Sequence, residues 1–214
     1  MRTCFSIKNF HFDSFLLVKL DCGGQSNDNT TYLVQENTNK PSNDECIYKI
    51  CPSSKAICRI RYDFTRFQIA GPYSADMATS NRAVVGDCVT DGFAVSSSSG
   101  VGSPLICGIN TGQHRKPFFN RILILNLRYG VKITHFSVYV DVVNNMCSQA
   151  TFFFKASTST TRYYDIQVTQ FECQDDMGGP PGCLQYLTST SGTIASFNYP
   201  IGSTSLTSTG SGQR

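Results

Sequence analysis

Hydrophobic and polar residues alternate with a period of two in several short stretches, separated by turns rich in Ser and Gly. The clearest case is residues 163–171. This period is typical of half-buried β-strands, because successive side chains of a strand point to opposite faces of its sheet. No long window has apolar residues at helical spacing. The chain is therefore predicted to be all-β, a sandwich or barrel of short strands. The predicted strands are residues 58–64, 67–69, 92–95, 105–107, 138–142, 151–155 and 163–171.

The composition argues against two classes of partner. Lys and Arg total 18 and Asp and Glu total 15 among 214 residues, so the net charge is only +3. There is no dense basic cluster interleaved with aromatic residues, the usual mark of a nucleic-acid interface. A membrane helix needs about 18 apolar residues in a row, and the longest apolar run here, residues 122–127, lies between Arg121 and Arg128. We expect no nucleic-acid partner and no membrane span.

The ten cysteines indicate structural disulfides and an oxidising compartment. Metal-binding cysteines usually come in close C-x-x-C pairs, and this sequence contains no such pair. The sequon that begins at Asn29 is a candidate N-glycosylation site, as expected of a secreted protein. The chain is therefore predicted to be secreted.

The two ends of the chain differ from its middle. Residues 1–21 do not resemble a signal peptide, because Asp13 precedes the short apolar core, Lys19 follows it and no small-x-small cleavage site appears. We treat residues 1–21 as an unreliable extension from a mispredicted start. Residues 174–182 are a Gly/Pro linker, and the Gly/Ser/Thr-rich end of the chain has too little apolar content to fold alone.

A set of motifs in the chain resembles the CUB domain, in particular that of secreted arthropod proteins. The resemblance implies a disulfide-linked antiparallel β-sandwich of the CUB type, jelly-roll-like, over residues 22–173. An incomplete second CUB-like unit would follow at residues 183–214. The motifs are Cys22-Gly23-Gly24, Cys46-Ile47-Tyr48, Ile60-Arg61-Tyr62-Asp63-Phe64, Cys88-Val89-Thr90-Asp91-Gly92-Phe93, Ile106-Cys107-Gly108, Thr111-Gly112-Gln113-His114, Ile166 to Cys173, and Gly182-Cys183-Leu184-Gln185-Tyr186.

The resemblance implies the disulfides Cys22–Cys46 and Cys88–Cys107. We expect two more within the same domain. Cys51 and Cys58 close a loop of only a few residues, and Cys147 and Cys173, which flank two strands, are the remaining pair. Cys4 and Cys183 are then left over, and the partner of Cys183 is expected in the remainder of the second unit.

Residues 115–137 do not fit their surroundings. The segment is basic, has no acidic residue and lacks the Ser/Thr-rich texture of its neighbours. Residues 115–116 can be encoded with a splice donor, and residues 136–138 with a splice acceptor. Removing the 23 codons between them keeps the frame and joins His114 to a Leu before Tyr139, as the resembling family reads. We hypothesise that the segment is a retained intron; the alternative is a genuine long loop or hairpin.

No arrangement of residues predicts catalysis or a cofactor. His114 has neither the sequence setting of a trypsin-like histidine nor a Gly-Asp-Ser-Gly-Gly partner, and no G-x-S-x-G motif occurs. The Gly-rich residues 98–103 lack the Lys of a phosphate-binding loop. We therefore expect the chain not to be an enzyme.

Many CUB domains bind Ca²⁺, and the resemblance aligns Asp91 with one of their ligands. The other two ligand positions carry no carboxylate here, since residues 69–71 lack a Glu and residues 156–159 lack an Asp. Ca²⁺ needs six to eight oxygen ligands, largely from carboxylates. No metal site is therefore predicted, and Asp91 is only a weak candidate.

Charged residues alternate on or beside one predicted strand, at Arg59, Arg61, Asp63 and Arg66. They form either a solvated outer face or a polar recognition face, in which Arg61 or Arg66 binds a carboxylate of a partner. Tyr73, in a Gly-Pro-Tyr turn, could add an aromatic contact from a loop.

The resemblance implies a non-catalytic extracellular module that binds protein or glycan ligands. The alternative is a regulatory or targeting region of a secreted serine protease or protease homologue whose catalytic domain is missing from this chain. A third possibility is a defective gene model without a stable product. Fold alone does not decide among these functions.

Overall fold

The structure is a computed structural model, and it describes only part of the chain. The described residues are 2–5, 17–38, 44–71, 88, 90–97, 100, 102–111, 137–155, 161–186 and 197. Tyr73, His114 and all of the expected insertion except Ser137 lie outside them. Within the described parts of the chain, no helix has the length and apolar content to span a membrane.

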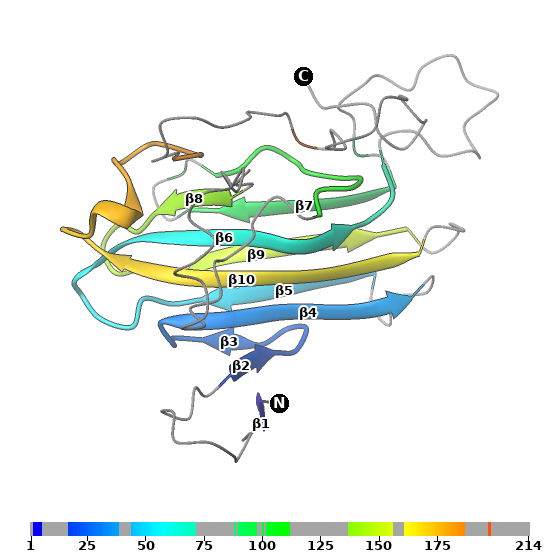
Figure 1. The fold of residues 1–214 in the computed structure, drawn as a ribbon, viewed down its shortest axis with the longest axis horizontal. Coiled ribbons are helices and arrows are strands. Elements are labelled where there is room, and N and C mark those ends of the chain that lie inside the picture. The colour runs from blue at the N-terminus through cyan, green and yellow to red at the C-terminus, as the bar shows by residue number, and fades with distance from the viewer. Residues whose placement is uncertain are drawn as a thin grey trace, which may run out of the picture.

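The described strands form two sheets, as the alternating pattern predicts. The larger sheet has the order β1-β2-β4-β10-β6-β8 and the smaller one β3-β5-β9-β7. Figure 1 shows the long strands of both sheets running in the same general direction. The elements are β1 (Arg2–Phe5), β2 (Leu17–Leu20), β3 (Gln25–Ser26), β4 (Thr30–Thr38), β5 (Glu45–Ile50), β6 (Ile57–Gln68), β7 (Asp91–Ser96), β8 (Ser137–Asp141), β9 (Ser148–Phe154), β10 (Arg162–Glu172) and the short 3₁₀ helix η3 (Asp176–Gly178).

The all-β sandwich prediction is confirmed, with differences in detail. The predicted strands in the middle of the chain correspond to β6, β7, β8, β9 and β10. Residues 105–107 form only an isolated bridge, between Ile106 and Phe93. Both sheets are mixed, because β2 pairs with β4, and β3 with β5, in parallel. The expected wholly antiparallel sandwich is wrong in this respect.

The N-terminal part of the chain contributes strands that the alternation did not predict. β4 is rich in Thr, Gln, Glu and Asn, which weakens its apolar signal, yet Leu33 on it is fully buried. β2 lies within the residues expected to be unreliable, and it places Leu20 in the core. Whether residues 1–21 are an unreliable extension stays a prediction.

Aromatic side chains from both sheets meet in the core. Phe152 of β9 stacks on Tyr164 of β10 with ring centroids 4.1 Å apart. Phe152 also contacts Phe93 of β7 at 4.5 Å and Phe67 of β6 at 6.1 Å. Aromatic rings bury large areas and add a specific contribution from their pairing geometry. Phe152 thus joins the two layers at the centre of the sandwich.

Two hydrogen bonds between hydroxyl groups also cross from one sheet to the other. The hydroxyls of Tyr48 on β5 and Tyr164 on β10 lie 2.8 Å apart, and those of Tyr62 on β6 and Ser148 on β9 lie 2.9 Å apart. All four residues are buried. Burial raises the pKa of all three tyrosines above the ordinary value. Each buried hydroxyl therefore has a partner, as a low-dielectric core requires.

Two of the expected disulfides, Cys22–Cys46 and Cys88–Cys107, are present. The first ties the turn before β3 to β5. The second ties the residues before β7 to the segment that bridges to Phe93. Cys183 is the free cysteine among the residues whose side chains the structure describes.

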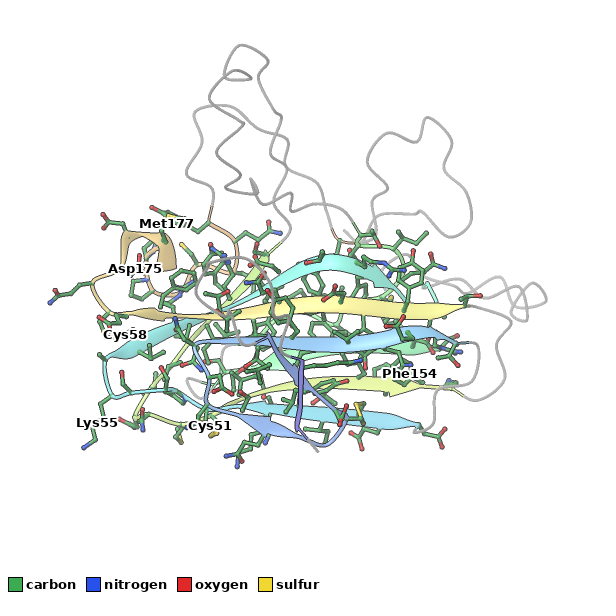
Figure 2. All side chains as sticks on the ribbon, turned by 60° about the horizontal axis from the view of Figure 1, so that its bottom comes forward. Cys51, Lys55, Cys58, Phe154, Asp175 and Met177 are labelled. Atoms are coloured by element: carbon green, nitrogen blue, oxygen red, sulfur yellow. A yellow bond between two sulfur atoms is a disulfide. The ribbon has the colours of Figure 1, made fainter. Side chains whose placement is uncertain are left out.

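The expected pairs Cys51–Cys58 and Cys147–Cys173 are wrong. The structure pairs Cys51 with Cys147 and Cys58 with Cys173, at Cα separations of 4.0 and 4.7 Å. Each bridge joins two neighbouring strands of one sheet. Cys51 and Cys147 lie just beyond the last register pair of β5 and β9, while Cys58 on β6 lies beside the end of β10. Cys51 and Cys58 lie at the same end of the sandwich (Figure 2), but at the ends of strands in different sheets.

Tryptic digestion without reduction distinguishes the two pairings. Lys55 separates Cys51 from Cys58, so the two cysteines fall in different tryptic peptides. We expect the Cys51 peptide to be linked to the Cys147 peptide, and the Cys58 peptide to the Cys173 peptide, because register places these residues opposite each other. Mass spectrometry that finds the Cys51 and Cys58 peptides linked to each other would contradict the structure.

Candidate functional site

The outer face of β6 is covered, although it carries charged residues. Arg59 is 3% exposed, Arg61 9% and Asp63 0%, so the expectation of a solvated or freely accessible face is wrong for these three residues. Their strand neighbours Ile60 and Tyr62 point into the core. β6 is therefore buried on both faces along this part. Buried charges need partners, and the partners define what this face can do.

Arg61 is neutralised within its own sheet. Its Nε lies 2.9 Å from Asp63 Oδ2, and the other oxygen of Asp63 accepts a 2.6 Å hydrogen bond from the Ser137 hydroxyl. The guanidinium also lies over the rings of Tyr139 and Phe171. Burial lowers the pKa of Arg61, but Asp63 and Tyr139 raise it above its ordinary value. Arg61 is thus a structural cation and does not present its charge to a partner.

Arg66 lies further along β6 and is exposed. Its guanidinium stacks over the ring of Tyr163 on β10, 4.7 Å from the centroid. The Tyr163 hydroxyl donates a 3.0 Å hydrogen bond to Gln68, which fixes the ring. Stacking orients the plane of the guanidinium while leaving its N–H groups available. Of the three predicted binding residues, Arg66 keeps an accessible charge, and Tyr73 lies outside the described residues.

Asp165 is the nearest carboxylate to this exposed arginine. It is the register partner of Arg66 on β10. Burial raises the pKa of Asp165 above its ordinary value, an effect that Arg66 and Lys19 oppose and Glu36 reinforces. Asp165 Oδ1 accepts no hydrogen bond. The charge of Arg66 is therefore only partly compensated within the molecule.

Asp91, the weak calcium candidate, forms a buried ion pair with Arg162 instead. Arg162 donates from Nε to one carboxylate oxygen at 2.6 Å and from Nη2 to the other at 2.9 Å. Both side chains are 0% exposed. The Ala70 N–H adds a third hydrogen bond to Asp91, at 2.7 Å. Both oxygens of Asp91 are thus already occupied by an internal cation, which leaves them unsuited to a metal ion.

Arg162 is the functional partner that sequence reasoning missed. It is the first residue of β10, and its guanidinium lies near the ring of Phe154, 5.8 Å from the centroid. It directly follows the loop in which a third calcium ligand was sought. A basic residue next to a ligand position without a carboxylate was a signal available in the sequence. Among the described residues, no group of three or more His, Cys, Asp or Glu side chains is placed to hold a metal.

The candidate glycosylation site lies on an exposed turn. Asn29 directly precedes β4 and is exposed. Thr31, the hydroxyl residue of the sequon, is buried and hydrogen-bonded to Ser26. A glycan on Asn29 would extend into solvent without disturbing the core. Glycosylation itself stays a prediction.

A pocket of about 120 Å³ lies between β8 and residues 182–184, with Tyr139, Asp141 and Cys183 in its lining. Typical small-molecule sites measure about 300–1,000 Å³. This pocket is too small for such a ligand. The geometry of the described residues is better suited to recognition on a surface than to binding in a cavity.

A family model of the animal CUB domain matches residues 180–212. No curated protein matches the chain. The match supports a CUB-type protein and falls on the second unit, whose opening Gly-Cys-Leu-Gln-Tyr motif first indicated the resemblance. The two-sheet sandwich of the preceding residues is consistent with the same fold class.

The Asp91–Arg162 pair makes a testable contribution to stability. Replacing one partner leaves the other as a buried, unpaired charge, which costs about 3–5 kcal/mol in comparable cases. We expect Arg162→Met to lower the free energy of unfolding by this amount in urea titrations. Adding Asp91→Asn to Arg162→Met should recover a large part of the loss, since it removes the orphaned charge while keeping an acceptor for Ala70.

Calcium provides the control for this interpretation. Because Arg162 occupies the carboxylate of Asp91, neither added calcium nor EDTA should change the Tm of the wild-type protein. A calcium-dependent rise of several degrees that disappears in Asp91→Asn would contradict the assignment of Asp91 to the ion pair alone.

Proposed function

We propose that this chain is a non-catalytic extracellular binding module of the CUB type, of the kind found in secreted arthropod proteins. Its ligand is a protein or glycan that presents carboxylate groups. The observation that carries the proposal is Arg66, exposed on the larger sheet and held in a fixed orientation by Tyr163. Four disulfides support an extracellular location, because such bridges persist in oxidising compartments.

The distribution of arginines supports Arg66 as the ligand-binding residue. The structure describes four arginine side chains, and three of them are buried in ion pairs with aspartates. Arg66 is the exposed member of this set. A guanidinium binds a carboxylate through two parallel hydrogen bonds, which gives both affinity and orientation. Tyr163 would contribute apolar contact area beside the charge.

The half-buried side chains around Arg66 would complete the recognition surface. Tyr32 on β4 and Asp165 on β10 lie on the same face of the sheet, in the register of neighbouring strands. An aromatic contact beside a charged group is typical of residues that dominate binding energy. Tyr73 could extend the surface from its loop. The site would read a carboxylate and its immediate apolar surroundings.

The second unit favours a tandem of binding modules over the protease alternative. The residues that follow the linker match an animal CUB domain, which is a binding unit. A regulatory region that led directly into a catalytic domain would place protease sequence at this point. Two modules in one chain could engage one ligand together, which would raise the overall affinity without new contacts.

Substitution of Arg66 tests the proposed site. We expect Arg66→Gln to weaken binding of carboxylate-bearing probes about tenfold, equivalent to about 1.4 kcal/mol, because a charge-assisted bidentate contact is lost. Surface plasmon resonance on the immobilised protein measures this. One arm uses a glutamate-rich peptide and the other a sialylated oligosaccharide, so the two arms separate protein from glycan ligands.

Lys55→Gln is the matched control. Lys55 is exposed, and it lies at the end of the sandwich opposite Phe154 (Figure 2). The substitution removes the same charge far from Arg66 and should leave binding unchanged. Equal losses in both variants would point to non-specific electrostatic attraction, and no loss in Arg66→Gln would exclude Arg66 from the site.

A further inference from the structure

Residues 182–184 lie along an edge of the larger sheet, although they belong to the region that matches the CUB family model. The Tyr139 N–H of β8 donates a 2.9 Å hydrogen bond to the Leu184 carbonyl. The Gly182 N–H donates a 2.9 Å hydrogen bond to Asp141 Oδ2. β8 is the last strand of this sheet, so its outer edge would otherwise have no neighbouring strand. The start of the second unit thus covers the edge of the first.

Arg59 connects this segment to the outer face of β6. Its guanidinium donates to the carbonyls of Pro180 and Cys183, and Nη1 lies 3.0 Å from Asp141 Oδ1. The side chain of Arg59 is 4% exposed. A guanidinium so deeply buried is stable only while acceptors surround it. The segment supplies two of these acceptors, and Asp141 binds both Arg59 and Gly182.

The linker is also shaped for this arrangement. Gly179 has φ +68°, and a Cβ atom there would lie 2.6 Å from Cγ of Tyr186. Only glycine satisfies both conditions without displacement. The Tyr186 ring in turn packs edge-on against Tyr139, with centroids 6.4 Å apart. Linker, segment and sheet therefore fit one another through backbone geometry, hydrogen bonds and an aromatic contact.

We propose that the β8 edge, together with the Arg59–Asp141 pair, is a docking surface for the second CUB-like unit of this same chain. Residues 180–186 are the part of that unit that docks, and they form a fixed joint in place of a flexible tether. The proposal depends on the second unit but not on the ligand at Arg66. The joint and the proposed binding function can therefore fail independently.

Amide hydrogen exchange of the full chain tests the joint. In Arg59→Met we expect the Tyr139 and Gly182 amides to exchange at least tenfold faster, because both are protected by contacts between the segment and β8. The Val142 amide donates to Cys58 on the β6 side of the same chain segment, at 2.8 Å. It should change less than twofold, and so reports that the sheet remains folded.

Two further variants make the outcome decisive. Arg66→Met removes an exposed arginine from the same strand and should leave both reporter amides unchanged. Asp141→Ala removes the other half of the pair at a partly exposed position, so it decides the matter if Arg59→Met does not fold. Unchanged exchange of Tyr139 and Gly182 in a folded Arg59→Met or Asp141→Ala protein would overturn the proposal.

An independent observation concerns the edge of β6 that faces away from β10. β8 pairs with residues 59–63 of this edge, and Ile109 forms an antiparallel bridge with Gln68 further along it. The Asn110 N–H donates to the Phe67 carbonyl at 2.9 Å. β10 occupies the other edge of β6 over the same residues. The segment around Ile109 and β8 therefore lie along one line.

The two registers along this line differ by 23 residues. β8 pairs Ser137 with Asp63, so the same register continued to Gln68 would reach residue 132. Gln68 instead pairs with Ile109, which is 23 positions earlier. The insertion inferred from the sequence has this same length. β6 carries a bulge at Thr65 between the two parts, which leaves a latitude of one residue.

The spacing of the two parts also fits a direct connection. Continuing the bridge register places Thr111 opposite Arg66, and Ser137 lies opposite Asp63, three residues further along β6. Three strand residues span about 10 Å. The three chain steps from Thr111 to His114 cover the same length. Gly112 could take up an irregularity that matches the bulge.

We infer that the segment around Ile109 and β8 are two parts of one edge strand, and that a form of the chain 23 residues shorter joins them directly. In that form a Leu takes the inward position of Val138, which is 0% exposed. His114 takes the place of Ser137, opposite Asp63, where it can still donate a hydrogen bond. Both replacements preserve the character of their positions.

Two deletions of different length test this inference. We expect deletion of residues 115–137 combined with Val138→Leu to raise the Tm by about 5 °C or more, because it closes a long loop and completes an edge strand. Deletion of residues 112–137 serves as the control. It leaves one chain step to cover about 13 Å, which a single step of 3.8 Å cannot do, so this variant should melt well below the parent.

Transcript sequencing provides the second measurement. Mature message that lacks the 23 codons would support the shorter form. The inference is overturned if the 23-residue deletion melts well below the parent protein, or if reads cover those codons uniformly in mature message.

Discussion

The structure depends on one strand, β6, being buried on both of its faces. Its inward residues Ile60, Tyr62 and Phe64 pack into the core, and its outward residues Arg59 and Arg61 are almost equally inaccessible. Charged groups cannot be buried without partners, so each outward charge requires a counter-charge or a carbonyl close by. This requirement fixes what lies over the sheet: β8 with Ser137, Tyr139 and Asp141, the end of β10, and the start of the second unit.

The amino-acid sequence was sufficient for the architecture and for half of the disulfides. Alternation identified β6, β7, β8, β9 and β10, because each has one face in the core. It did not find β4, whose exposed positions and short polar residues dilute the signal. The pairing of Cys51 with Cys147 followed from strand order, since β5 and β9 are neighbours although nearly a hundred residues apart in the chain. Proximity along the sequence was a misleading guide to these two bridges.

The candidate site was predictable only in part, for a related reason. Alternation placed Arg61 and Arg66 on one strand but could not tell which of them a later segment would cover. Residues 180–186 cover the part of the face near Arg59, and the Tyr139 and Phe171 rings cover Arg61, whereas Arg66 lies beyond this region. In the same way Asp91 could be recognised as a ligand-type carboxylate, yet its partner Arg162 comes from a strand some seventy residues later. Long-range topology, and not local pattern, decides the role of each charge.

The buried tyrosines that link the two sheets give the protein an optical property of its own. The chain has ten tyrosines and no tryptophan, so its ultraviolet absorbance and emission above those of phenylalanine come from phenol rings. Tyr48, Tyr62 and Tyr164 resist ionisation while folded, because burial raises their pKa above the model value of 10.0. The stability that their neutral form provides is complete below about pH 10 and declines as alkali rises through the folded-state values. The appearance of phenolate absorbance from these three rings would therefore mark the separation of the two sheets.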